Sequence, residues 1–135
     1  KIGEAIIVRP GNDMALLCTG TLMYETLKAA DILEKIGISA EVVSFHTVKP
    51  LDKIYLQNAS TRFNLLVTVE EHSRIGGFGS AVSEWRSSTN CNVQQISLGT
   101  DDEFMHEVGS QGYARKKYGL TAENIAARVA ASLKA

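Results

Sequence analysis

The sequence lacks long hydrophobic runs and has no excess of charge of one sign, and each absence excludes a class of protein. No apolar stretch approaches the roughly 20 residues that a membrane-spanning helix needs, so we expect no membrane contact. Lys and Arg number 14 against 15 Asp and Glu, a net charge of −1. This balance favours neither nucleic acid nor an anionic membrane as a partner, and we predict that nucleic acid is not bound.

Cysteine is also scarce, with only Cys18 and Cys91 in the chain. Two cysteines cannot form a metal cage, and the three histidines have no zinc-binding spacing, so we predict no metal site in this domain. Cys18 lies in an apolar run that is typical of a buried free thiol. No secretory signal is visible, and we therefore expect a reducing, cytoplasmic setting. The chain begins at Lys1 rather than at methionine, and we interpret it as part of a longer polypeptide.

The length of 135 residues fits one domain over residues 1–135, with 44% hydrophobic and 21% charged residues. Apolar runs typical of strands alternate with stretches of helical spacing. Strands are predicted over 4–8, 14–19, 40–46, 64–70 and 93–98, and helices over 22–36, 53–61, 78–87, 112–117 and 122–133. Thr21, Asp52 and Thr121 are the expected N-caps of three of these helices. The alternation predicts a three-layer α/β/α sandwich with a mostly parallel sheet of about five strands.

The most plausible chemical site is the run Glu70-Glu71-His72 at the end of the predicted strand 64–70. Ligands of open α/β sheets bind at the carboxyl ends of strands. A carboxylate beside an imidazole can fix its tautomer or raise its pKa. The alternative is that the two glutamates form structural ion pairs or an interface contact, with His72 a partly buried loop residue, and we favour this alternative over direct chemistry.

A glycine-rich loop, with Gly76, Gly77 and Gly79, follows this strand and precedes a predicted helix. Such a loop can bind an anion, because its backbone amides approach the ligand at a helix N-terminus. It lacks the Lys-Ser/Thr ending of a P-loop and does not fit the dinucleotide pattern. Close packing of the helix against the sheet is the alternative, and it is the one we favour.

Other polar residues carry weaker signals. His46 and His106 are interpreted as a satisfied histidine and an exposed loop residue. Three serines lack the strained turn of a serine hydrolase: Ser73, Ser80 and Ser83. The cluster Arg115-Lys116-Lys117 could meet an anionic partner, but a solvated helix end is favoured.

Several segments, taken in order, resemble the C-terminal domain of the transketolase family. The most specific is Leu66–His72 (LVTVEEH) followed by Gly76–Val82 (GGFGSAV). The others are Asp13–Thr21 (DMALLCTGT), Gly37–Ala40 (GISA), Val48–Asp52 (VKPLD) and Lys117–Ile125 (KYGLTAENI). Each segment alone is a weak signal, whereas the ordered series covers nearly the whole chain.

The resemblance implies a dimeric parent enzyme that uses thiamine diphosphate and magnesium. In this family the cofactor lies between two other domain types, and the catalytic glutamate also lies elsewhere. The resemblance therefore predicts no catalytic residue and no bound cofactor in this domain, which alone would be inactive. Glu70, Glu71 and His72 match the family near a domain boundary, as groups at an interface or behind the active site. The expected partners are other domains or a subunit of the same enzyme, in a homodimer or heterotetramer.

Segment 99–112 departs from the family pattern and weakens any choice among subfamilies. Our first hypothesis is an enzyme that transfers a two-carbon ketol unit between sugar phosphates. The same domain occurs in 1-deoxy-xylulose-5-phosphate synthase and in 2-oxoacid dehydrogenase beta subunits, which remain alternatives. A third hypothesis, from a different class, is a free-standing regulatory module that binds a small anion at the glycine loop.

Overall fold

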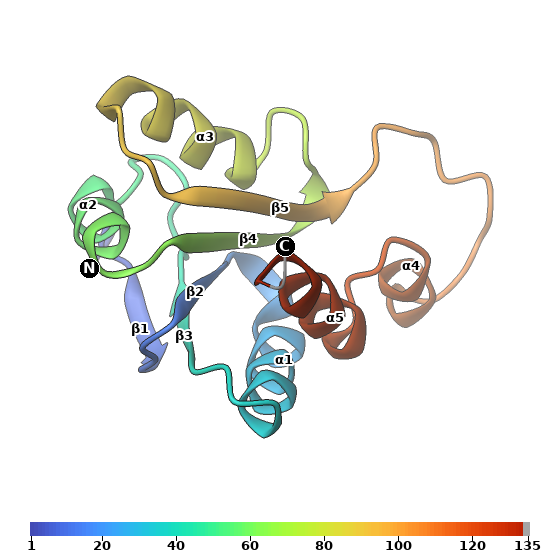
Figure 1. The fold of residues 1–135 in the computed structure, drawn as a ribbon. Coiled ribbons are helices and arrows are strands. Elements are labelled where there is room, and N and C mark those ends of the chain that lie inside the picture. Colours follow the sequence, from blue (N-terminus) through green and yellow to red (C-terminus); the bar gives the residue numbers. More distant parts are fainter. Residues whose placement is uncertain (134–135) are drawn as a thin grey trace.

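Five strands form one sheet in the order β1-β3-β2-β4-β5 (Figure 1). The structure is a computed structural model, and it describes residues 1–133. The strands are β1 (Ile6–Arg9), β2 (Met14–Cys18), β3 (Ala40–Ser44), β4 (Leu65–Ser73) and β5 (Gln94–Thr100). Strands β2 to β5 pair in parallel, and β1 pairs with β3 in the antiparallel direction at one edge.

Helices cover both faces of the sheet, which gives three layers (Figure 1). They are α1 (Met23–Lys35), α2 (Lys53–Arg62), α3 (Phe78–Thr89), α4 (Gln111–Lys117) and α5 (Ala122–Leu133). One hydrophobic cluster lies between the sheet and α1 with α5, and a second lies between the sheet and α2 with α3. The structure confirms the predicted three-layer α/β/α sandwich with a mostly parallel sheet of five strands.

The central strand β2 is buried along its whole length, as its continuous apolar run predicts. Strand β1 differs: it begins two residues later and ends one residue later than the predicted strand 4–8, and Ile6, Ile7 and Val8 are all exposed. Successive side chains of a strand point to opposite faces of the sheet, so neither face is covered at this edge. The sequence of β1 is apolar like that of a buried strand and gives no sign of its edge position.

Two of the three predicted N-caps are present. The Asp52 carboxylate accepts the Tyr55 amide at 2.9 Å, and the Thr121 hydroxyl accepts the Asn124 amide at 3.4 Å. Thr21 was expected to cap helix 22–36, and this prediction is wrong. A 3₁₀ turn, η1 (Gly20–Leu22), precedes α1, and neither element has a side-chain cap. The Thr21 hydroxyl instead donates to Glu71.

Strand β4 extends three residues beyond its predicted end at Glu70, after a register shift between Val69 and Ser73. Glu71 and His72 are therefore strand residues rather than loop residues. No helix within residues 1–133 is both long enough and apolar enough to cross a membrane.

Candidate functional site

The carboxyl ends of β2 and β4 lie side by side at the centre of the sheet. The chain leaves β2 through α1 toward β3 on one side, whereas β4 and β5 lie on the other side. The two ends are in direct contact, because the Thr19 amide donates to the Val69 carbonyl at 3.1 Å. A reversal of strand order of this kind is where open α/β sheets bind ligands. The predicted site run Glu70-Glu71-His72 therefore stands at the position where a ligand site is expected.

Glu70 is 1% exposed and points toward helix α3. Its two carboxylate oxygens accept the backbone amides of Phe78, at 2.6 Å, and Gly79, at 2.8 Å. These amides open the first turn of α3, where the helix dipole favours a negative charge. The carboxylate of Glu70 thus takes the place that a bound anion would take at this helix end.

The three glycines of the candidate anion loop have different surroundings. A Cβ on Gly77 would lie 2.1 Å from a Glu70 carboxylate oxygen, so only glycine allows Glu70 to reach the helix. A Cβ on Gly79 would lie 2.8 Å from the Thr68 hydroxyl and 2.7 Å from that of Ser97, because α3 packs closely on the sheet. Gly76 has a φ of +74°, which favours glycine, and its amide donates to the Ser80 hydroxyl at 3.0 Å. The amides that open this helix are thus largely paired within the chain.

The loop also lines an open groove of about 840 Å³ beside α3. Residues of the turn after β3 form the opposite wall, including Lys49, Pro50 and Lys53. Neither lysine forms an ion pair within the part of the chain that the structure describes. Trp85 and Ile54 make much of the groove apolar.

Glu71 points away from Glu70 and is the centre of a second network. Its carboxylate accepts from the Thr21 hydroxyl, from Gln111 Nε2 at 3.1 Å, and from Arg115 Nε at 3.2 Å and Nη2 at 3.0 Å. Partial burial acts to raise the pKa of Glu71, but the hydrogen bonds from Arg115 and Thr21 outweigh it and hold the pKa below its ordinary value. The network joins β4, the 3₁₀ turn and α4 at one point.

Arg115 was expected at a solvated helix end, and this prediction is wrong. Its side chain is only 15% exposed, because it turns back from α4 to meet Glu71 and the Thr21 hydroxyl. Lys116 is exposed, as predicted. The partners Glu71 and Arg115 are 44 residues apart, and no local sequence signal connects them.

The histidines do not join either carboxylate. His72 is exposed, and its Nδ1 lies 2.9 Å from the backbone oxygen of Ser73. His46 lies 3.3 Å from the Lys1 carbonyl oxygen, and His106 is exposed, as predicted. Within residues 1–133, no group of three His, Cys, Asp or Glu residues is placed to bind a metal ion.

One buried side-chain oxygen is unpaired within the described range, the hydroxyl oxygen of Thr68 on β4. Cys18 at the end of β2 is fully buried, and burial raises the pKa of its thiol to about 11. The thiol is therefore neutral and unreactive at physiological pH. Glu70 is thus held by helix amides and Glu71 by Arg115, so neither carboxylate is free to act as a base.

Fold and site together define a three-layer α/β domain whose strand-end carboxylates are paired inside the chain. Residues 3–125 match the family model described as transketolase, C-terminal domain. The chain therefore belongs to the transketolase C-terminal domain family, as the sequence resemblance predicts.

Three curated relatives show how the chain relates to whole enzymes. It is 37% identical to a putative transketolase C-terminal section of Methanocaldococcus jannaschii, covering 99% of this chain and 41% of that protein. It is 41% identical to the 6-deoxy-6-sulfo-D-fructose transketolase subunit SqwH of a Clostridium species, covering 92% and 38%. It is 39% identical to 1-deoxy-D-xylulose-5-phosphate synthase of Thermomicrobium roseum, covering 98% and 21%. The chain thus spans less than half the length of these relatives.

Two solved structures share the fold. A split-gene transketolase, described as an inactive beta4 tetramer, has a TM-score of 0.89 at 35% identity, over 99% of this chain and 43% of that one. A transketolase mutant from Pichia stipitis has a TM-score of 0.71 at 22% identity, over 95% and 18%. The second likeness concerns the fold alone.

Proposed function

We propose that this chain is the C-terminal domain of a transketolase-type enzyme, where it serves assembly and supports the domains that carry the active site. The transketolase and 1-deoxy-D-xylulose-5-phosphate synthase families are thiamine-diphosphate enzymes. The observation that carries the proposal is the internal pairing of Glu70 and Glu71. Both carboxylates are engaged by groups of the same chain, which supports a structural role for this strand end.

Thiamine diphosphate and magnesium are, in this proposal, held by other parts of the parent enzyme. The diphosphate needs amides or cations free to bind its oxygens, and a magnesium ion needs oxygen ligands that are not engaged elsewhere. At the strand ends the α3 amides bind Glu70, and Arg115 binds Glu71. These residues do not fit the cofactor, so we assign this domain no step of the chemistry.

For the parent enzyme we propose transfer of a two-carbon ketol unit between sugar phosphates, in a cytoplasmic enzyme. The chain covers about two fifths of the transketolase section and subunit, and about one fifth of the synthase. Both covered fractions are consistent with a C-terminal domain of a longer protein. The sequence identities to the three relatives are similar and do not favour one of them. A deoxy-xylulose-phosphate synthase or an oxoacid dehydrogenase beta subunit is therefore the alternative parent.

The expected partners are the other domains or a second subunit of the enzyme, in a homodimer or heterotetramer. The structural relative described as a beta4 tetramer supports the idea that chains of this type also associate with copies of themselves. A free-standing anion-binding module has less support, since Glu70 already fills the α3 N-terminus.

The test uses the complete parent enzyme with Glu71→Gln or His72→Ala. If the domain serves assembly, both variants weaken the dimer, while turnover at saturating cofactor and substrate stays within about twofold of the parent. Glu84→Gln, an exposed glutamate on α3, is the matched control. Dimer dissociation is measured by sedimentation and turnover by a ketol-transfer assay.

Two outcomes contradict the proposal. A large loss of turnover with an intact dimer would assign Glu71 to the chemistry. A complete enzyme without thiamine-diphosphate-dependent activity would reject the proposed reaction.

A further inference from the structure

The helices on the two faces of the sheet are packed differently. On one face, α1 and α5 pack along each other over a shared hydrophobic cluster. On the other face, α2 and α3 make few direct contacts, and the groove of about 840 Å³ lies between α3 and the start of α2. Exposed apolar side chains border it, with Ile54 79% exposed and Val48 37% exposed. A groove with apolar walls between two helices has room for a further segment of polypeptide.

One wall of the groove is a single face of α3. Ser80, Ala81, Glu84 and Ser88 line it at the helical spacing of three and four residues. The side chains of Ser80 and Ala81 are small, so a second backbone can approach α3 closely. From Gly77 to Ser88 this face is about 16 Å long, which corresponds to about 11 residues of helix or about five residues of extended chain.

Charges of both signs border the groove. Lys49 and Lys53 lie on the wall formed by the turn after β3 and the start of α2, and Glu84 lies on α3. None of the three forms an ion pair within residues 1–133. A segment with acidic residues on one flank and a basic residue on the other is complementary to this arrangement.

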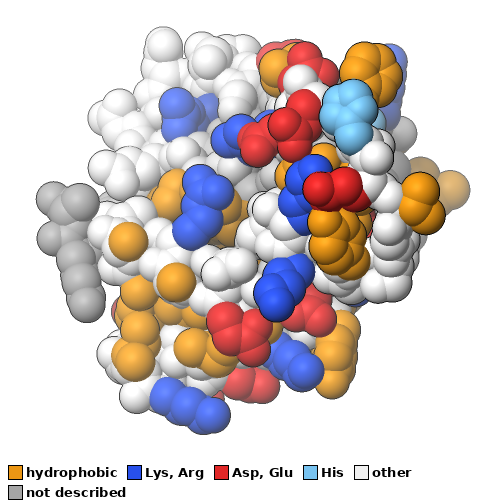
Figure 2. All heavy atoms as spheres, turned by 90° about the vertical axis from the view of Figure 1, so that its right-hand side faces the viewer, with side chains coloured by type: hydrophobic (Ala, Val, Ile, Leu, Met, Phe, Trp, Pro, Cys, Tyr) orange, Lys and Arg blue, Asp and Glu red, His pale blue; other side chains and the backbone are white. Residues whose placement is uncertain are grey.

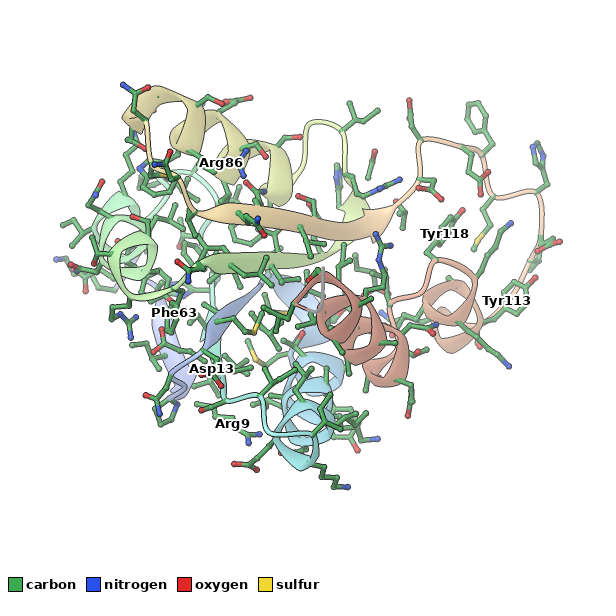
Figure 3. The ribbon with its side chains drawn as sticks, in the orientation of Figure 1. Arg9, Asp13, Phe63, Arg86, Tyr113 and Tyr118 are labelled. Carbon is green, nitrogen blue, oxygen red and sulfur yellow. The ribbon has the colours of Figure 1, made fainter. Side chains whose placement is uncertain are left out.

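The surface formed by α4 and the loop between β5 and α4 provides a contrast. Figure 2 shows acidic and basic side chains gathered on that side of the molecule. Several of them are paired within the chain, such as Asp101 with Arg74 and Glu107 with Lys117. Tyr113, which lies by α4 in Figure 3, also donates to Glu107. The groove instead combines apolar walls with unpaired charge, and we therefore place a polypeptide contact there.

The first residues of the chain lie against the same wall. The Lys1 carbonyl oxygen is 3.3 Å from His46 Nε2, and the Gly3 amide donates to the Thr47 hydroxyl at 3.3 Å. Gly3 also lines the groove, where a Cβ on it would lie 3.1 Å from Pro50 Cγ. A polypeptide that continues upstream of Lys1 therefore starts at the edge of the groove.

We infer that the segment which precedes residue 1 in the parent enzyme lies in this groove, along α3. The inference rests on the proposed function, which makes this chain the C-terminal domain of a longer polypeptide. The segment is amphipathic, with apolar side chains toward Ile54 and acidic residues toward Lys49 and Lys53. Because it is joined to the chain next to its site, its effective concentration is high and a contact of modest size is sufficient. The contact fixes this domain relative to the domain before it.

The first experiment measures hydrogen exchange by mass spectrometry in the complete parent enzyme. Amides of the segment before residue 1 should exchange about tenfold or more slowly than in a free synthetic peptide of the same sequence. Ala81→Arg places a large side chain in the groove and should largely remove this protection. Ser87→Arg is the matched control, because Ser87 is exposed on α3 and lies outside the groove. It should leave the exchange unchanged.

A second measurement uses this chain and a synthetic peptide that covers the segment before residue 1. Trp85 is the only tryptophan of the chain and lines the groove, so its fluorescence reports binding. Lys49→Glu and Lys53→Glu should each raise the dissociation constant about fivefold, because they repel acidic residues of the peptide. Lys116→Glu, on α4, should leave it unchanged. Circular dichroism checks that each variant is folded.

Three results would overturn the inference. They are a segment that exchanges as fast as the free peptide, protection that survives Ala81→Arg, and a peptide that fails to bind or binds both lysine variants as tightly as the parent chain. The lysine variants also decide the question if Ala81→Arg does not fold. A protected segment in a parent enzyme without ketol transfer would reject the proposed reaction alone, because hydrogen exchange does not depend on activity.

Discussion

The Glu70 carboxylate occupies the N-terminus of α3, where an anion would otherwise bind. Its carboxylate is 1% exposed and accepts two α3 amides at 2.6 and 2.8 Å. Such charge-assisted hydrogen bonds in a buried place are stronger than neutral ones. The doublet of glutamates was recognisable in the sequence, but the amide partners were not, because they depend on where α3 begins.

Replacing Glu70 with Gln should destabilise the domain by about 1–3 kcal/mol. The variant keeps one acceptor oxygen but turns an NH₂ group toward an amide donor, which leaves a buried N–H unpaired. Urea unfolding of both proteins gives the difference in free energy. Glu84→Gln on the exposed side of the same helix should change it by no more than about 0.5 kcal/mol. If the Glu70 variant and the parent had the same free energy of unfolding, the hydrogen bonds of Glu70 would not stabilise the domain.

At the scale of the element, α3 and α4 are held in place by different means. Helix α3 lies close on the sheet, where Gly79 faces the Thr68 and Ser97 hydroxyls. Helix α4 has no buried residue and is held by Arg115 and by the loop before it. The close packing of α3 thus depends on glycine at position 79, whereas the position of α4 depends on the Arg115 side chain.

This difference predicts opposite effects of the same substitution. Gly79→Ala forces α3 away from β4 and β5 and should cost about 1–3 kcal/mol. A Cβ on Gly112 in α4 would lie 3.8 Å from the Ser110 hydroxyl, an ordinary contact, so Gly112→Ala should be neutral or stabilising by up to about 1 kcal/mol. Thermal unfolding of both variants measures the two shifts. A destabilised Gly112→Ala would contradict the loose packing of α4, which has no buried residue.

At the scale of the whole molecule, the Glu71 network ties three distant parts of the chain together. Because the folded-state pKa of Glu71 is lowered, its stabilisation is present above the unfolded pKa of about 4.3 and is lost as the pH falls through the folded pKa. The domain should therefore lose part of its stability in acid below about pH 4.

Arg115→Gln should remove this contribution, so the variant is less stable than the parent at neutral pH and the gap narrows in acid. The difference in free energy of unfolding narrows because protonated Glu71 gains no ion-pair energy from Arg115 in the parent. The variant has no guanidinium at this position at any pH. Urea unfolding at a series of pH values measures it. Lys116→Gln, at the neighbouring exposed position, should show no such gap. If Arg115→Gln and Lys116→Gln lost the same stability relative to the parent, the effect would come from the change in overall charge rather than from the ion pair.

The sequence predicted the layers of this fold better than its connections. Apolar runs such as Met14–Cys18 locate buried strands, because a strand covered on both faces has no polar positions. The antiparallel direction of β1, the 3₁₀ turn at Thr21 and the inward turn of Arg115 were not predictable. Each depends on residues far away in the chain: β3 for β1, and Glu71 for the other two.

The carboxylate at the start of α3 also bears on the proposed role of this domain in an enzyme that acts on sugar phosphates. Glu70 lies eight residues before the amide that it binds, so its local concentration at the helix end is set by the chain and not by the solution. A dissolved phosphate cannot readily displace a competitor that never diffuses away. We therefore expect the hydrogen bonds between Glu70 and the first amides of α3 to persist at high phosphate concentration.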